Sequence, residues 1–205
     1  MGYDVLIKNG ALIDGTGTAA RHGSVAITDG KIIEVGEIDG PANQVIDAEG
    51  AVVAPGFIDP HTHYDAQICW DGAVTPSSWH GVTSVVVGNC GVGIAPCKLE
   101  SREIAMRDLV NVEAIPYDVL EEGITWDWET FPEYLDALEK MPRVMDIATQ
   151  VPHGSVRAYV MGERGARNED PTANDLITMA QIVQEGIEAG ALGFTSSRTM
   201  LHRAL

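Results

Sequence analysis

The stretch PGFIDPHTHYDAQICWDG, residues 55–72, marks the point at which the pattern of the chain changes. Before it, short alternating segments are separated by Asn-Gly, Asp-Gly and Glu-Gly pairs, which are typical of turns between strands. After it, apolar strand-like runs alternate with helical patterns, which predicts parallel strands joined by helices. We therefore predict a small antiparallel β-domain over residues 1–54 and an α/β domain over residues 55–205.

The second part of the chain predicts an incomplete barrel. Its clearest helix, residues 171–190, begins with a capping pair, Thr172 and Asp175, and ends at Gly190. A complete (β/α)₈ barrel usually takes about 250 residues, more than residues 55–205 supply, so the expected architecture is a partial TIM (β/α) barrel. Strands are expected near residues 53–60, 82–88, 144–151 and 191–196, and further helices near residues 100–113 and 128–141.

The composition narrows the classes of partner. With 13 basic and 30 acidic residues, the formal net charge of −17 argues against nucleic acid and against an anionic membrane surface. No apolar run approaches the roughly 20 residues of a membrane span, and the N-terminus lacks the pattern of a secretory signal. Three sparse cysteines do not form a disulfide framework. We expect a cytoplasmic protein with a small-molecule substrate and neither a nucleic-acid nor a membrane partner.

Two histidines within the opening stretch are candidate metal ligands. His61 and His63 follow an apolar strand, and positions i and i+2 of a strand share a face. The carboxyl ends of parallel strands are where α/β folds place their active sites. The alternative is a pair of polar residues on a loop. The position at the change of pattern favours the metal site.

Cys90 is the third candidate ligand. It lies in GVTSVVVGNCG, residues 81–91, directly after a β-branched run that is typical of a strand buried on both faces. Neighbouring glycines allow unusual backbone angles and leave room around the thiol. A thiolate suits zinc, although a free cysteine is more often a small buried apolar residue. Cys69 and Cys97 lack this glycine-rich setting, and we interpret both as packing residues.

Three further residues are weaker candidates for substrate binding. His153 follows the third expected strand, where a metal ligand, an acid–base group and a histidine that caps the backbone are all compatible with the pattern. Arg157 and Arg198 would suit an acidic substrate, because guanidinium groups bind carboxylates through two parallel hydrogen bonds. Surface salt bridges are the alternative for both arginines.

The motifs named so far resemble those of a known family. The segments DVLIKNGALIDGTG and IDAEGAVVAPGFIDPHTH are similar to the N-terminal pattern of the amidohydrolase superfamily. Other segments resemble its N-acyl-D-amino-acid deacylase (D-aminoacylase-like) branch, and the resemblance covers nearly the whole chain. These segments are HTHYDAQICWD, SSWHGVTSVVVGNCGVGIAP, PHGSVRAYVMGERG and EAGALGFTSSRTMLHR.

The resemblance implies metal-dependent hydrolysis of a linear amide, with an N-acyl-D-amino acid giving a carboxylate and a D-amino acid. It implies one or two divalent metal ions, zinc above all, with His61, His63 and Cys90 as ligands. It also implies a TIM barrel beside a β-sandwich, to which residues 1–54 contribute the N-terminal part. Two further histidine ligands and the catalytic aspartate are expected beyond residue 205.

Two alternatives accompany this reading. A partial barrel leaves free strand edges, which favour self-pairing, so the chain would be a catalytically incomplete fragment that forms a homo-oligomer or joins a complementary C-terminal chain. A cyclic-amide hydrolase, similar to hydantoinases and dihydroorotases, is the other alternative. Those relatives rely on a lysine where this chain has Cys90.

Overall fold

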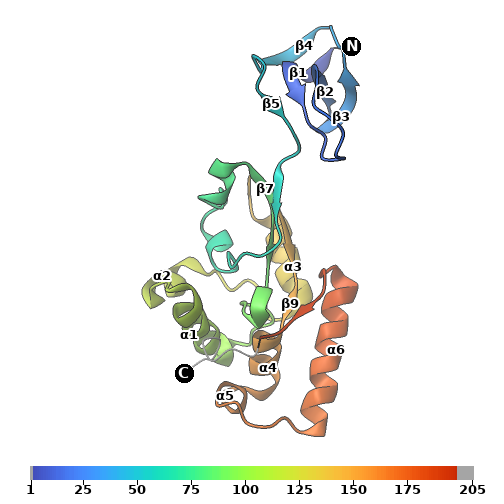
Figure 1. The fold of residues 1–205 in the computed structure, drawn as a ribbon. Coiled ribbons are helices and arrows are strands. Elements are labelled where there is room, and N and C mark those ends of the chain that lie inside the picture. Colours follow the sequence, from blue (N-terminus) through green and yellow to red (C-terminus); the bar gives the residue numbers. More distant parts are fainter. Residues whose placement is uncertain (1, 198–205) are drawn as a thin grey trace. The chain divides into compact units, whose positions relative to one another are not determined.

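The structure is a computed structural model, and it describes residues 2–197. The chain divides into two compact units, residues 1–56 and residues 57–205, which are shown in Figure 1. The break between them falls within the stretch at which the sequence pattern changes.

The first unit is a five-stranded sheet with a mixed rather than an antiparallel arrangement. Its strands follow the order β3-β2-β1-β4, and β5 also pairs with β1. The pairs β1–β2 and β2–β3 are antiparallel, as expected, but β4 and β5 both run parallel to β1. The strands are β1 (Tyr3–Leu12), β2 (Arg21–Thr28), β3 (Lys31–Gly36), β4 (Ala42–Asp47) and β5 (Val52–Val53).

The prediction of an antiparallel domain was wrong because the chain crosses the sheet after β3. The connection carries Ile38 into the small core beside Leu6 and Ala26. It then enters β4 on the edge of β1 opposite to β2, in the same direction as β1. Burial of Ile38 removes apolar surface from water, which stabilises this crossing over a further hairpin.

The Asn9-Gly10 pair is the clearest misleading turn signal. Both residues lie inside β1, where the register with β2 shifts between Ile7 and Gly10, so the pair forms a β-bulge. Asn9 has φ +57° in this bulge. By contrast, the Asp29-Gly30 pair makes the expected hairpin turn between β2 and β3. A bulge with a residue at positive φ, as here, and a tight hairpin turn favour the same residue types, so the sequence signal alone does not separate them.

The second unit has the α/β character that the sequence predicts. The strands β6 (Phe57–Asp59), β7 (Val82–Val87) and β8 (Asp146–Thr149) form a parallel sheet in the order β6-β7-β8. The strands β9 (Val151–Pro152) and β10 (Phe194–Thr195) form a second parallel pair. Val85, Val86 and Val87 of β7 are all buried, and because successive residues point to opposite faces, this half of the strand is buried on both faces, as the β-branched run predicts. The first half of the strand, residues 82–84, is partly exposed.

Six α-helices connect and cover these strands within residues 57–197 (Figure 1). The three expected helices are present, and α2, α4 and α5 are additional. The α-helices are α1 (Arg102–Glu113), α2 (Tyr117–Gly123), α3 (Phe131–Lys140), α4 (His153–Met161), α5 (Glu163–Ala166) and α6 (Ala173–Ala189). The single-turn helices are η1 (Gln67–Cys69), η2 (Ser77–His80), η3 (Asn89–Gly91) and η4 (Leu99–Ser101).

The N-terminus of α6 is built as the sequence predicts. The Thr172 side chain accepts a hydrogen bond from the Asp175 amide, and the Asp175 carboxylate accepts one from the Thr172 amide. Gly190 follows the last turn with φ +124°, an angle that disfavours other residues. This capping fixes where the helix begins and ends, and therefore where β10 returns to the sheet.

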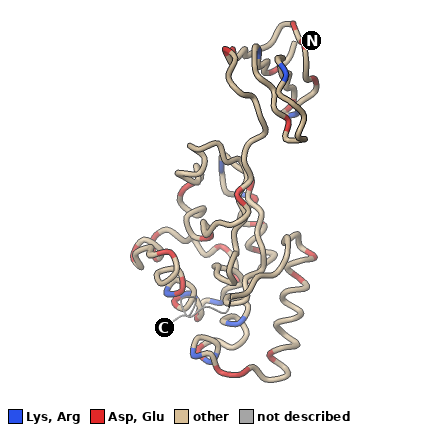
Figure 2. The backbone as a smooth tube through the Cα atoms, in the orientation of Figure 1, with Lys and Arg blue, Asp and Glu red and all other residues tan. Residues whose placement is uncertain are grey.

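Charge is spread along the chain rather than concentrated. Figure 2 shows acidic residues distributed over both units, and the less numerous basic residues are interspersed among them within each unit. Within residues 2–197, no helix combines the length and the apolar character that crossing a bilayer would require.

Candidate metal centre

The two histidines lie in the loop directly after β6. The Asp59 carboxylate accepts a hydrogen bond from the His61 amide at 3.2 Å, which turns the chain out of the strand. Thr62, between the histidines, is buried, and its amide and hydroxyl both donate to the Val86 carbonyl of β7, at 3.0 and 2.8 Å. The loop is therefore fastened to the neighbouring strand at its middle residue, and the flanking histidines take their positions from it.

Cys90 lies in a tight turn after β7, residues 88–91, here named the Cys90 turn. Gly88, Cys90 and Gly91 have φ values of +76°, +56° and +75°. A Cβ on Gly88 would lie 2.2 Å from the Gln150 carbonyl oxygen, so a side chain has no room there. A left-handed cysteine costs backbone energy, and such strain persists only where surrounding contacts hold it in place.

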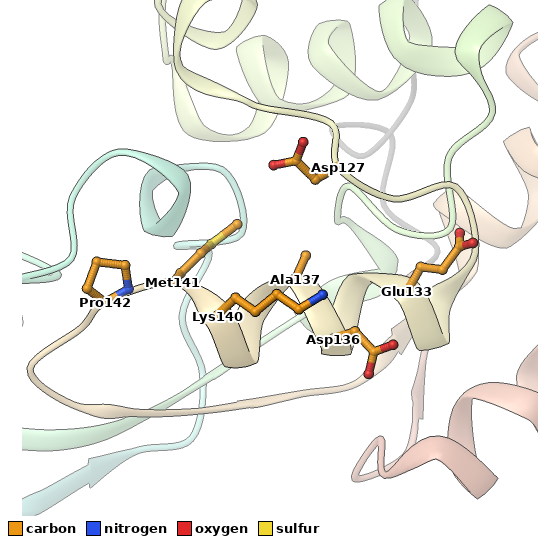
Figure 3. A pocket seen from close by; sticks show the side chains of 7 residues that line it. All are labelled: Asp127, Glu133, Asp136, Ala137, Lys140, Met141 and Pro142. Carbon is orange, nitrogen blue, oxygen red and sulfur yellow. The ribbon is translucent and has the colours of Figure 1, made fainter.

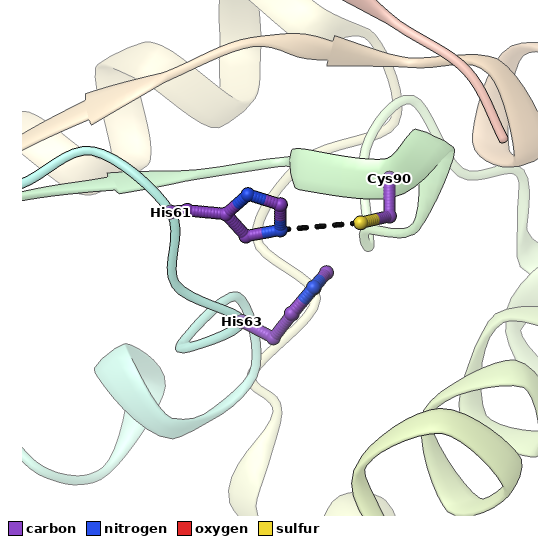
Figure 4. Close-up of side chains that lie close together, drawn as sticks. All are labelled: His61, His63 and Cys90. Atoms are coloured by element: carbon purple, nitrogen blue, oxygen red, sulfur yellow. Dashed lines mark hydrogen bonds between the residues drawn. The ribbon is translucent and has the colours of Figure 1, made fainter.

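These two segments bring three donor side chains together. Nitrogen atoms of His61 and His63 and the Cys90 sulfur all lie within 4.8 Å of one another. His61 Nε2 is 3.2 Å from Cys90 Sγ, and the two imidazole centroids are 5.5 Å apart. Figure 4 shows the rings, from the loop after β6, and the thiol, from the turn after β7, directed to a common point. The structure thus brings together the three predicted ligands.

The chemistry of this cluster fits a zinc ion. Zinc binds thiolate sulfur at about 2.3 Å and imidazole nitrogen at about 2.0 Å in a tetrahedral arrangement, which separates neighbouring donor atoms by roughly 3.5 Å. The 3.2 Å between His61 Nε2 and Cys90 Sγ is close to that spacing. A set of two nitrogens and one sulfur also matches the preference of zinc over magnesium or calcium, which take oxygen ligands.

Two acidic residues that the sequence did not assign lie next to the candidate ligands. The Glu113 carboxylate, at the end of α1, is 3.9 Å from His63 Nδ1, where a charged partner can orient the ring. Asp65 accepts a hydrogen bond from the Gly88 amide at 2.9 Å, and burial raises the pKa of its carboxyl to about 7. Asp65 thereby links the histidine loop to the Cys90 turn.

Cys69 and Cys97 differ from Cys90 in their surroundings. Burial raises the pKa of both thiols to about 12, which keeps each of them protonated near neutral pH. Cys97 is buried, and Cys69 is part of η1 and packs against the main apolar core of the second unit. These positions agree with the interpretation of both residues as packing residues.

His153 directly follows β9, at a strand end as predicted, and it lies beside the Cys90 turn. His153 is the first residue of α4. Its Cβ lies 3.4 Å from the position that a Cβ added to Gly91 would take. Partial burial, with the nearby charge of Arg157, lowers the pKa of its imidazole. The sequence did not indicate α4, because Pro152 and Gly154 flank its start and both residues disfavour helix interiors. A role of His153 in substrate binding remains a prediction.

The arginine candidates are placed differently. The Arg157 guanidinium donates to the backbone carbonyls of Gly165 and Glu169, so in this structure it holds the chain around α5. Its predicted contact with substrate remains a prediction. Arg198 lies outside the described residues.

A separate cavity of about 500 Å³ lies along α3, and Figure 3 shows its lining side chains. Among the described residues that line it, none is a candidate ligand. Glu133 is engaged in the capping box at the start of α3. The lining residues are Asp127, Glu133, Asp136, Ala137, Lys140, Met141 and Pro142.

Comparison with known proteins places the chain in a family. The model of the family described as "Amidohydrolase family" matches residues 44–205, most of the chain. The chain belongs to the amidohydrolase family. This match includes both segments of the candidate metal centre.

Relatives within this amidohydrolase family share sequence and fold with the chain. D-aminoacylase of Alcaligenes xylosoxydans xylosoxydans is 36% identical over 197 residues, which are 95% of this chain and 37% of the relative. The structure of N-acyl-D-glutamate deacylase from Bordetella bronchiseptica, complexed with zinc and a phosphonate inhibitor, is 31% identical with a TM-score of 0.74, over 96% of this chain and 38% of that one.

A structure of D-aminoacylase, solved in a study of its binuclear metal centre, is 32% identical to this chain with a TM-score of 0.78. The match covers 95% of this chain and 38% of the D-aminoacylase chain. The chain therefore spans little more than a third of the length of these relatives.

Proposed function

We propose that this protein takes part in metal-dependent hydrolysis of linear amide bonds, with N-acyl-D-amino acids as substrates and a carboxylate and a D-amino acid as products. The observation that carries the proposal is the convergence of His61, His63 and Cys90 to within 4.8 Å. The names of the relatives, D-aminoacylase and N-acyl-D-glutamate deacylase, support the substrate class.

We assign the three converging side chains to one zinc ion, and the proposal also allows the same site to bind a second divalent ion. A bound divalent ion polarises an amide carbonyl and lowers the pKa of a water molecule. The ligand set brings one thiolate and two neutral imidazoles, so the ion keeps a net positive charge. His61 is exposed and His63 is partly buried, which leaves the site open on the side of His61.

The architecture that we infer for this activity is the first part of a TIM (β/α) barrel. The parallel order β6-β7-β8 supports it, because consecutive barrel strands pair in parallel. We infer that the small sheet is part of a β-sandwich. The sparse cysteines support a cytoplasmic location. We place the acid–base group and the further ligands implied by the resemblance outside the described residues.

A substrate panel tests the proposal. A full-length protein that carries residues 1–205 together with the acid–base group, and residues 1–205 alone, are stripped with a chelator and reloaded with zinc. Both are assayed on N-acetyl derivatives of apolar and acidic D-amino acids, on their L-enantiomers and on hydantoins. We expect the full-length protein to release D-amino acids in a reaction that requires zinc and is abolished by Cys90→Ala. Turnover of hydantoins without turnover of N-acyl-D-amino acids would instead establish the cyclic-amide alternative. We disfavour that alternative because this chain has Cys90 where hydantoinases and dihydroorotases rely on a lysine.

A second candidate function is that of a catalytically incomplete chain that associates with a copy of itself or with a complementary chain. The supporting observation is exposed apolar surface on edge strands. Ile58 of β6 is 69% exposed and Phe194 of β10 is 45% exposed, and such edges favour pairing. Light scattering with metal analysis separates the candidates, because a monomer that turns over substrate excludes this one.

A further inference from the structure

Asn89 is a buried amide between the two segments that carry the candidate ligands. Asn89 is only 4% exposed, and it directly precedes Cys90 in the Cys90 turn. Neither the sequence nor the family match gives it a role. Each of its polar atoms has a partner within hydrogen-bonding distance, as follows.

The side-chain nitrogen of Asn89 bridges the histidine loop and β7. Nδ2 donates to the Thr62 carbonyl at 3.1 Å and to the Val86 carbonyl at 2.8 Å. Thr62 is the residue between His61 and His63. A single side chain next to Cys90 therefore grips the backbone midway between the two histidines.

The amide oxygen of Asn89 is fixed from a third segment. Oδ1 accepts a hydrogen bond at 2.9 Å from Nε2 of Gln150, which lies between β8 and β9. The Gln150 amide also donates to the Val87 carbonyl. This contact sets which way the Asn89 amide faces, because the oxygen must meet Gln150 and the nitrogen then meets the two carbonyls.

We propose that Asn89 is a positioning residue that sets the distance between the Cys90 thiol and the His61–His63 pair, and so sets the affinity of the site for its metal ion. The inference rests on the proposed metal centre. Without Asn89, the Thr62 carbonyl loses its link to the Cys90 turn, and the two segments move more independently. Three donor atoms can grip one ion only while their spacing is held, because small changes in ligand geometry weaken binding.

Cobalt(II) is the probe for the test, because it replaces zinc and gives an absorption band when a thiolate binds it. The full 205-residue chain and three variants are titrated with cobalt(II). Asn89→Ala removes all three hydrogen bonds of the amide. Gln150→Met keeps Asn89 but removes the donor that orients it. Ser155→Ala is the matched control, because the Ser155 hydroxyl makes an equally buried hydrogen bond, at 2.8 Å, to the Gly93 carbonyl outside the ligand segments.

We expect Asn89→Ala to weaken cobalt binding by about tenfold to a hundredfold, the range found for residues that support ligands. Gln150→Met should weaken it by a smaller factor, and Ser155→Ala should leave it unchanged. Hydrogen exchange of the Thr62 amide, which bonds to Val86, should quicken in Asn89→Ala and Gln150→Met but not in Ser155→Ala. If Asn89→Ala does not fold, Gln150→Met carries the comparison.

Equal cobalt affinity in the wild type and both amide variants would overturn the role of Asn89. The same holds for equal losses in the variants and in Ser155→Ala. A wild-type chain without a thiolate band would overturn the proposed metal centre instead. In that case unchanged exchange of the Thr62 amide would show that Asn89 does not join the segments, so the two failures are distinguishable.

Discussion

Two of the turns in the second unit that hold a non-glycine residue in left-handed conformation use that residue differently. In the turn of residues 71–75, here named the Asp71 turn, Val74 has φ +49° and its side chain is completely buried. In the Cys90 turn, Cys90 has φ +56° and its thiol meets the His61 imidazole. In the first turn the strained backbone places an apolar side chain in the core, whereas in the second it places the candidate ligand Cys90 beside His61.

A polar side chain fastens each of the two turns. Asp71 accepts hydrogen bonds from the Thr75 amide and hydroxyl and from Gln67, all within its own stretch of chain. Asn89 instead bonds to Thr62 and Gln150, on segments distant in the sequence. Local bonds shape one turn, whereas long-range bonds register the other against the rest of the site. Variants in and around both turns test this difference.

Cys90→Ser should remove the metal-binding role that we propose for the Cys90 turn. We expect cobalt affinity to fall by on the order of a hundredfold or more, because a ligand is lost and not only its support. The thiolate band should disappear at the same time. Cys69→Ser is the control, and it should retain both the band and the affinity. A full thiolate band in Cys90→Ser would exclude Cys90 as the ligand.

Gly88→Ala and Gly72→Ala form a matched pair, one in each turn. A Cβ would lie 2.2 Å from the Gln150 oxygen at position 88 and 2.3 Å from the Pro142 oxygen at position 72. Only Gly88 has a left-handed φ, at +76°. We expect both variants to lose about 3 kcal/mol of unfolding free energy in urea, with the larger loss for Gly88→Ala.

Only Gly88→Ala should also weaken cobalt binding, since only position 88 lies in the turn that carries the candidate ligand Cys90. A similar loss of affinity in Gly72→Ala would mean that general destabilisation, and not the geometry of the Cys90 turn, controls the metal site.

Thr195→Val tests the clamp that β10 places on the Cys90 turn. The Thr195 hydroxyl accepts from the Gly91 amide at 3.1 Å and donates to the Gly88 carbonyl. Loss of these bonds should cost about 1 kcal/mol of unfolding free energy, with a few-fold loss of cobalt affinity. Thr178→Val, which removes a surface hydrogen bond to the Asn174 carbonyl on α6, is the control. Its cobalt affinity should equal that of the wild type.

Asp71→Asn should have the smallest effect, and only on stability. Burial alone would raise the pKa of Asp71, but hydrogen bonds from Thr75, Gln67 and Ala73 outweigh burial and lower it to about 2, from a usual value of 3.8. The carboxylate therefore stabilises the fold above about pH 4 and loses that contribution as the pH falls towards 2.

We expect Asp71→Asn to lose about 1 kcal/mol at neutral pH, after allowance for solvent screening. Its unfolding free energy should also vary less between pH 4 and pH 2 than that of the wild type. Thermal unfolding across this pH range measures both effects, with the exposed Asp170→Asn variant as control. An unchanged slope would contradict the assigned role of the Asp71 hydrogen bonds.

The sequence predicted the parts of the site that depend on local pattern. A buried β-branched run ending in glycines indicated Cys90, and a His-x-His pair after an apolar strand indicated the other two candidate ligands, His61 and His63. Asn89 and Glu113 were missed because their partners depend on register between distant segments. The Asn89–Gln150 bond spans 61 residues, and no local pattern reports such a pairing.

The sheet of the first unit shows a similar division. The hairpin at Asp29-Gly30 was predictable because its two strands are adjacent in sequence. The parallel pairing of β4 with β1 was not, because it depends on where Ile38 is buried after the chain crosses the sheet.

The spacing of the ligands along the chain also has a consequence for the order of assembly. His61 and Cys90 are only 29 residues apart, whereas the Thr195 clamp reaches back 107 residues to Gly88. Closing the shorter loop costs less chain entropy, and close pairs tend to meet early in folding. We expect the ligands to assemble before the clamp, so that pulse-labelled exchange protects the Thr62 amide earlier than the Gly91 amide. The metal centre would then be a nucleus around which the later strands settle.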